Sequence, residues 1–163
     1  MLAAGIDFEV GIEGHIESQA TVSVEGMAWL VQELEDRKLF FRITELDDWD
    51  YWFFQHDPNN TVDWQDRHVA DQVRSFLFPV ILSPYRRGVT TWELIDKHSQ
   101  WRADSPLTRP LPFDDNLAAK PMALAIRDAF MPRNAIYNKT DTLKPNQKLV
   151  PALPAPPVIT PPA

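Results

Sequence analysis

The fold is decided by the segment LFFRITELD, which occupies residues 39–47. Its aromatic and β-branched residues are typical of a β-strand, which we predict over residues 39–46. Two acidic residues, Glu45 and Asp47, stand at its end. Because side chains alternate along a strand, these two positions point to the same side. The segment therefore predicts a strand that carries two carboxylates at its C-terminal end.

Two further strands flank this one in the sequence. We predict the first over residues 8–12, ending in the polar cluster Glu13-Gly14-His15, and the third over residues 88–92. Helix-sized segments separate the strands. Such alternation of strands and amphipathic helices predicts an α/β fold with a mainly parallel sheet.

Three helices are predicted from their start signals and apolar spacing. Ser23 can cap the first, and the second is expected to begin at Asp63. Pro79 should kink or stop this second helix, because proline removes a backbone donor. The last helix opens at Lys120-Pro121, where the missing N–H of a proline does no harm. The expected buried faces are Met27, Leu30, Val31 and Leu34, then Val69, Val73, Phe76, Leu77 and Val80, and finally Met122, Ile126, Ala129 and Phe130.

Length and composition limit the classes of protein that the chain can represent. Its 163 residues suffice for one domain but fall short of the roughly 250 that a complete (β/α)₈ barrel needs. The net charge of −7 argues against a nucleic-acid partner, and without cysteine there is no disulfide or thiolate zinc site. No apolar run is long enough to span a membrane. Residues 1–5 lack the basic flank and apolar stretch of a signal peptide, so none is expected.

The C-terminal end of the chain differs in composition from the rest. From Lys144 onward seven of twenty residues are proline, which predicts a polyproline-like tail. We expect one domain over residues 1–135 and a Pro-rich tail or linker over residues 136–163. A less favoured hypothesis is that residues 151–157, with Pro-x-x-Pro-like spacing, dock into an aromatic groove of a partner protein.

Four motifs in this sequence resemble those of family 10 glycoside hydrolases, in the family's order. They are GIEGHI at residues 11–16, ITELD at 43–47, TWELID at 91–96 followed by Trp101-Arg102, and a closing segment at 111–121. The resemblance covers roughly residues 5–130. It implies a partial TIM (β/α)₈ barrel made of about the last three βα units, with functional residues at the C-terminal ends of the strands.

The resemblance implies a retaining endo-1,4-β-xylanase, which hydrolyses β-1,4-xylosidic bonds in xylan. Glu45 matches the nucleophile, although TELD taken alone is more often an ordinary strand end. The family's general acid/base lies on the fourth strand, in a segment that this chain does not contain, so we expect little or no activity in isolation. No cofactor and no metal are implied. The expected ligands are xylan and xylo-oligosaccharides.

Other site residues also follow from the resemblance. His15 matches a histidine that orients the nucleophile by hydrogen bonding. Asp47 either supports the hydrogen-bond network of the site or caps the turn. Trp92 and Trp101 match aromatic walls around the bound sugar, since flat rings suit the C–H faces of pyranoses. The other tryptophans are expected in the core: Trp29, Trp49, Trp52 and Trp64.

The remaining residues of the motifs leave alternatives open. Arg102 either contacts substrate or pairs with Asp96. Glu13, expected to bind substrate, stands where the family has glutamine, and a second acid beside Glu45 disfavours the ionised nucleophile. Glu93 replaces a glycine. These departures also fit a non-catalytic carbohydrate-binding remnant.

Three βα units cannot close a barrel, so the edges of the sheet need an explanation. We expect a stretch of a longer protein, because Met1 falls just before a strand; self-association through the exposed edges or aggregation are the alternatives. Secretion or a periplasmic location is implied only by the polymeric substrates of the family.

Overall fold

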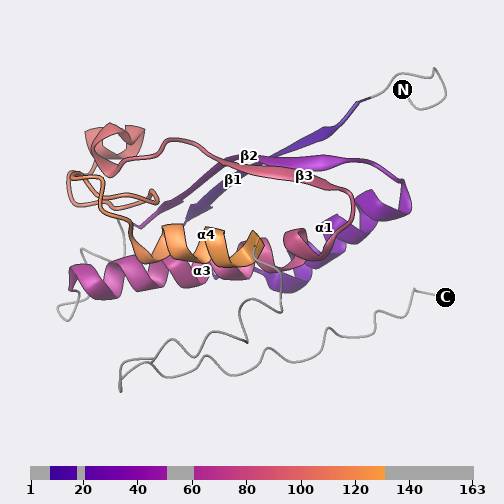
Figure 1. Ribbon diagram of the computed structural model, residues 1–163, viewed down its shortest axis with the longest axis horizontal. Helices are drawn as coiled ribbons and strands as arrows, with labels where there is room; N and C mark the ends of the chain where they lie inside the picture. Colours follow the sequence, from indigo (N-terminus) through magenta and orange to yellow (C-terminus); the bar gives the residue numbers. More distant parts are fainter. Residues whose placement is uncertain (1–7, 18–20, 51–60, 131–163) are drawn as a thin grey trace. The chain divides into compact units, whose positions relative to one another are not determined.

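The computed structural model describes residues 8–17, 21–50 and 61–130. Its strands β1 (Val10–Glu17), β2 (Phe41–Trp49) and β3 (Arg86–Thr91) form a parallel sheet in the order β1-β2-β3 (Figure 1). The predicted α/β class with a parallel sheet is confirmed. The expected domain boundary, the Pro-rich tail and Trp52 lie outside the described residues.

The first strand begins and ends later than predicted. Its pairing with β2 runs from Val10 to Glu17, so the polar cluster at residues 13–15 lies within the strand. The strand was predicted from its apolar residues alone. The residues that continue it carry exposed polar side chains on one face, so this extension was not predicted. Along β1 the buried residues Gly14 and Ile16 alternate with exposed ones, as expected when one face of a sheet is covered.

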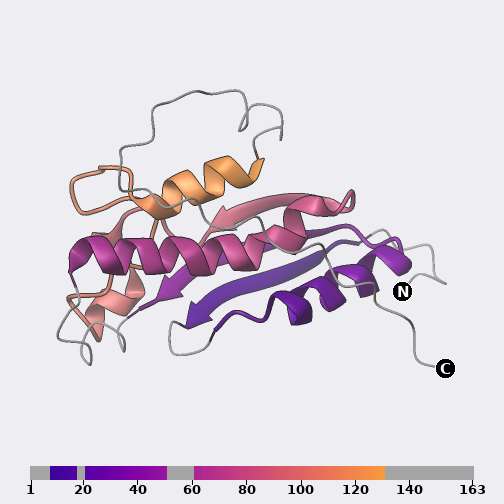
Figure 2. The same ribbon diagram turned by 90° about the horizontal axis from the view of Figure 1, so that it is seen from below.

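Three α-helices cover one face of this sheet (Figures 1 and 2). They are α1 (Val24–Asp36), α3 (Val62–Leu82) and α4 (Pro121–Phe130), and α3 packs against both of the others. In the described part of the chain, no helix has the length and apolar character needed to cross a membrane. The core lies between helices and sheet and includes Phe41, Ile43, Leu46, Val69, Val73, Leu77, Val80 and Met122.

The helix start signals were identified correctly to within one residue. Ser23 caps α1 by accepting a hydrogen bond from the Gly26 backbone, and Thr61 caps α3 in the same way. Of the two predicted effects of Pro79, a stop at that residue is wrong, because α3 continues to Leu82, whereas a kink stays a prediction. Only three residues follow this proline, so its missing donor affects just the last turn.

Most of the predicted buried faces agree with the structure. Met27, Leu30 and Phe76 are only partly buried, but they pack against the core. Two expectations are wrong. Trp29 is 59% exposed, because it lies on the side of α1 opposite Val31, and Phe130, the last residue of α4, is 43% exposed.

A buried ionic network anchors the long segment that follows β3. This segment contains the short helices η2 (Asp96–His98) and η3 (Gln100–Ala103). The Lys120 ammonium donates to both carboxylate oxygens of Asp96, at 3.0 and 2.9 Å. Arg109 makes a two-fold contact with Asp66 of α3, at 2.7 and 2.9 Å. These contacts hold the segment that carries Trp101 against the rest of the fold.

Candidate active site

Four side chains from two neighbouring strands gather on the face of the sheet that is not covered by the helices. Glu13 and His15 come from β1, and Glu45 and Asp47 come from β2. In the strand register Glu13 lies opposite Glu45 and His15 lies opposite Asp47. Alternation along each strand and parallel pairing between them therefore produce the cluster. A register shift between Ile12 and Glu13 sets this pairing.

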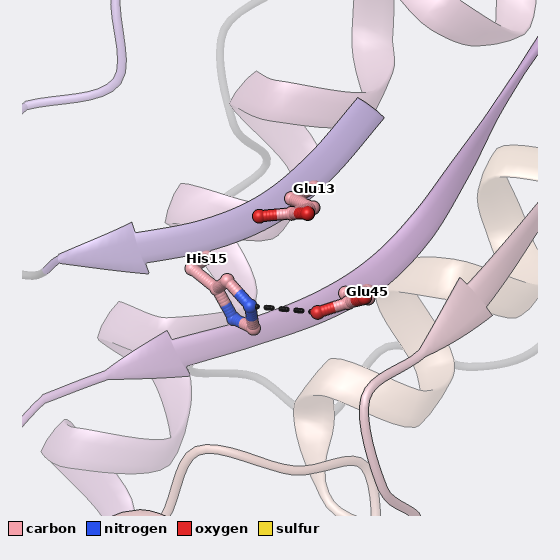
Figure 3. A group of neighbouring side chains, drawn as sticks. All are labelled: Glu13, His15 and Glu45. Carbon is pink, nitrogen blue, oxygen red and sulfur yellow. Dashed lines mark hydrogen bonds and ion pairs between the residues drawn. The ribbon is translucent and has the colours of Figure 1, made fainter. Parts of the chain in front are cut away.

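His15 links the two carboxylates of β2 through its two ring nitrogens. Nε2 lies 3.0 Å from Oε2 of Glu45, and Nδ1 lies 2.8 Å from Oδ1 of Asp47. Figure 3 shows the imidazole reaching from β1 towards Glu45. A protonated ring donates to both partners at once, whereas a neutral ring can donate to only one.

The surroundings of His15 favour its charged form. Partial burial alone would lower its pKa, but the hydrogen bonds and negative charges of Asp47 and Glu45 outweigh burial and raise the pKa above the ordinary 6.5. Asp47 is fully buried, and burial raises the pKa of its carboxyl against the lowering effect of hydrogen bonds from His15 and Trp101. These contacts favour the charged form of the ring between the half-buried Glu45 and the fully buried Asp47.

Tryptophan rings surround this cluster. Trp101 donates from Nε1 to Oδ2 of Asp47 at 2.7 Å, and Trp49 stacks on Trp101 with ring centroids 5.3 Å apart. Trp92 meets the His15 ring edge-on at 5.9 Å and is 42% exposed. Asp47 thus connects His15 to the segment that carries Trp101. Two roles were predicted for Asp47, support of the hydrogen-bond network of the site or capping of the turn, and these contacts favour the first.

Trp49 was missed as a site residue. Sequence reasoning assigned it to the core, yet it contacts Trp101 beside the carboxylates. A signal was present, because positions 45, 47 and 49 alternate along one strand and so share a face.

The predicted pairing of Arg102 with Asp96 is wrong. Arg102 donates to the backbone oxygen of Thr108 at 2.7 Å and contacts Asp115 at 3.2 Å, whereas Asp96 is occupied by Lys120. The carboxylate of Asp96 faces Lys120 and Arg109 instead.

Glu13, His15 and Glu45 have the composition of a metal site. Each offers one ligand atom, and the three atoms lie within 4.8 Å of one another (Figure 3). Glu13 and His15 are exposed, so the group is open to solvent.

Known proteins resemble this chain over most of its length. A model of glycosyl hydrolase family 10 matches residues 3–129. Xylanase B from Clostridium stercorarium F9 is 28% identical, with a TM-score of 0.60, over 78% of this chain and 39% of that one. The Penicillium canescens endo-1,4-beta-xylanase XylE is 24% identical, with a TM-score of 0.64, over 78% and 38%.

A third solved structure gives the same result. Xylanase 10B from Thermotoga petrophila RKU-1, crystallised with xylobiose, is 20% identical, with a TM-score of 0.62, over 74% of this chain and 35% of that one. The chain therefore spans between 35% and 39% of the length of these three xylanases. No curated protein matches the sequence.

Proposed function

Because the chain belongs to glycosyl hydrolase family 10, we propose that it supplies the nucleophile side of a retaining endo-1,4-β-xylanase site. Glu45 is the proposed nucleophile. The supporting observation is its contact with His15, which is itself held by the buried Asp47. A nucleophilic carboxylate must be ionised and correctly aimed, and an imidazolium fixed at its other nitrogen provides both.

The reaction assigns a separate task to each of these groups. A Glu45 oxygen attacks the anomeric carbon of the sugar, the bond to the leaving oxygen breaks, and a glycosyl-enzyme forms. His15 positions the carboxylate through its 3.0 Å contact. Asp47 acts indirectly. It holds the imidazole of His15 through Nδ1 and holds the segment after β3 through Nε1 of Trp101.

Departure of a sugar alcohol requires a proton from a second carboxyl about 5–5.5 Å from the nucleophile. In the family this acid stands on the fourth strand, to which no part of this chain corresponds. General acid assistance is typically worth about 10²–10⁴-fold in rate. We therefore propose that the chain by itself hydrolyses xylan poorly or not at all.

The tryptophans support a sugar ligand. Trp92 presents an exposed ring beside His15, and the centroid of the Trp101 ring lies 6.2 Å from that of the same imidazole. Such rings pack on the apolar faces of pyranoses. The T. petrophila enzyme was solved with xylobiose and the Cellvibrio japonicus Xylanase10C mutant with xylopentaose, so xylan and xylo-oligosaccharides are the proposed ligands. We propose that Glu13 and Arg102 contact the sugar at the edge of this site. Action on a polymer implies that the protein is secreted or periplasmic.

An aryl xylobioside with a 2,4-dinitrophenolate leaving group tests the nucleophile without the missing acid. This leaving group takes the electron pair of the broken bond and needs no proton. We expect release of about one equivalent and then a stall, because hydrolysis of the intermediate needs the absent base. Mass spectrometry should place the adduct on Glu45, and Glu45→Gln should abolish it. Absence of both release and adduct would contradict the assignment, and steady cleavage of xylan would contradict the predicted inactivity.

A carbohydrate-binding remnant is the second candidate, favoured by the exposed ring of Trp92 and by the acid at position 13. It predicts that xylohexaose binds with measurable heat in calorimetry while no adduct forms. Trp92→Ala should remove that heat. A ligand that gives no heat even at saturating concentration excludes this alternative.

A further inference from the structure

The cluster of Glu13, His15 and Glu45 has a property beyond sugar chemistry. It brings one imidazole nitrogen and two carboxylate oxygens within 4.8 Å of one another at the surface of the sheet. The resemblance implies that the family usually has glutamine at position 13, so Glu13 adds a second carboxylate to the usual pattern. Zinc binds histidine nitrogen and glutamate oxygen, and three such protein ligands leave a fourth position open for water or another ligand.

Asp47 prepares His15 for this role. Metal-bound histidines almost always donate their other N–H to a carboxylate, which fixes the tautomer and aims the free nitrogen. Here Nδ1 lies 2.8 Å from Oδ1 of Asp47, a fully buried group outside the three ligands. That contact directs the lone pair of Nε2 towards Glu45 and Glu13.

The distances require little movement. Ligand atoms at about 2.0–2.2 Å from a tetrahedral zinc ion stand roughly 3.4 Å apart. Nε2 of His15 and Oε2 of Glu45 are already 3.0 Å apart, so a small separation suffices for this pair. Glu13 is exposed, and a rotation of its side chain can bring its oxygen nearer.

We infer that Glu13, His15 and Glu45 form a binding site for a divalent transition metal such as Zn²⁺, oriented by Asp47. Imidazole favours zinc over magnesium and calcium, which prefer shells made of oxygen alone. A bound ion would occupy the carboxylate that we propose as nucleophile. This consequence, mutual exclusion of metal and sugar at Glu45, rests on the proposed function, whereas metal binding does not.

Calorimetric titration of the full 163-residue chain with ZnCl₂ tests the site directly. We expect one ion per chain. Glu13→Gln should weaken binding by at least about tenfold, since it removes one of the two carboxylate ligands. Asp47→Asn should weaken it by about 10–100-fold, the usual effect of changing a partner of a metal-bound histidine. Glu17→Gln is the matched control. Glu17 lies on β1 four residues after Glu13 and is not one of the three ligands, so this variant should leave the affinity for zinc unchanged.

The outcomes separate this inference from the proposed function. Equal affinity in wild type, Glu13→Gln and Asp47→Asn chains with unchanged circular dichroism, or no heat at all, would overturn the metal site. Co²⁺ gives a second readout, because a tetrahedral site with nitrogen and oxygen ligands produces visible absorption that should disappear in Glu13→Gln. Zn²⁺ should also block labelling of Glu45 by the aryl xylobioside. Metal binding without any labelling would refute the nucleophile assignment and leave the metal site intact.

Discussion

At the scale of single residues, His15 and His68 experience opposite environments although both are partly buried. His15 contacts Asp47 and Glu45, and these two carboxylates raise its pKa against the effect of burial; Glu13 also lies nearby. For His68 burial is the larger effect and lowers the pKa, against the weaker charges of Asp71 and Asp50. The two rings therefore report on their surroundings independently.

NMR titration with a chelator present checks this contrast. We expect the His15 ring to titrate above pH 6.5 and the His68 ring below it. Because the folded pKa of His15 exceeds its unfolded value, its stabilising contribution is complete below pH 6.5 and is lost as pH rises through the folded pKa. Asp47→Asn should lower the midpoint of His15 and leave that of His68 in place. Identical midpoints for the two rings would contradict the assigned contacts.

The sequence predicted through strand alternation that Asp47 lies on the same side as Glu45, and the resemblance to the family implied that His15 lies beside Glu45. It did not predict the partner of Arg102. That partner depends on the path of residues 97–115, where no periodic pattern constrains the chain. The metal-like placement of Glu13 depends on a one-residue register shift, which no sequence signal indicates.

At the scale of elements, the contact of α3 with the sheet depends on one glycine between the two site residues of β1. A methyl group at Gly14 would lie 3.0 Å from Cγ2 of Ile43 and 3.2 Å from the Phe76 ring. Both neighbours belong to or pack against the core, so neither can move freely. The small residue therefore lets the helix approach the strand that presents Glu13 and His15.

Gly14→Ala should destabilise the fold by about 1–3 kcal/mol, the usual effect of overpacking a core. Gly88→Ala in β3 is the matched control, because a methyl group there meets no atom within 4 Å. That control should be neutral or stabilise by up to about 1 kcal/mol. Urea unfolding of the two variants gives the comparison, and equal midpoints would show that Phe76 yields without cost.

Helix starts were easier to predict than element ends. Capping by Ser23 and Thr61 is a local event that side-chain chemistry determines. The continuation of α3 past Pro79 is not local: burial of Pro79 and Val80 against the other elements outweighs the lost hydrogen bond. Tertiary packing decides such boundaries, which a single sequence does not show.

At the scale of the whole molecule, the sheet raises the question of its edges. Among the described residues, the outer edges of β1 and β3 pair with no further strand. Open edges promote pairing between chains. We expect the average mass measured by light scattering to rise with concentration.

Thr90→Lys should reduce this rise, because lysine on an edge strand opposes edge-to-edge pairing. Thr90 is an exposed residue of β3, and Thr21→Lys, outside the strands, is the matched control. A mass that stays monomeric over a hundredfold range of concentration would argue against association through the sheet.

The buried ionic network joins parts of the molecule that are distant in sequence. Asp96 follows β3, Lys120 precedes α4, and Arg109 connects both to Asp66 of α3. Burial raises the pKa of Asp96 and lowers that of Lys120, so desolvation offsets much of their attraction. The intact network need not add much net stability, but removal of one member leaves a charge without its partner.

Lys120→Met should therefore cost about 3–5 kcal/mol, because it removes the ammonium that donates to both oxygens of the fully buried Asp96, while Arg109 stays 4.0 Å away. Arg127→Met, which breaks only the exposed pair with Asp128, should change the free energy of unfolding by less than about 1 kcal/mol. Asp96→Asn should recover part of the loss when added to Lys120→Met, since it removes the stranded charge. Urea unfolding measures all three variants. Equal losses of stability in Lys120→Met and Arg127→Met, or a deeper loss when Asp96→Asn is added, would contradict this role. The ionic network would then not be what joins the segment that carries Trp101 to α3 and α4.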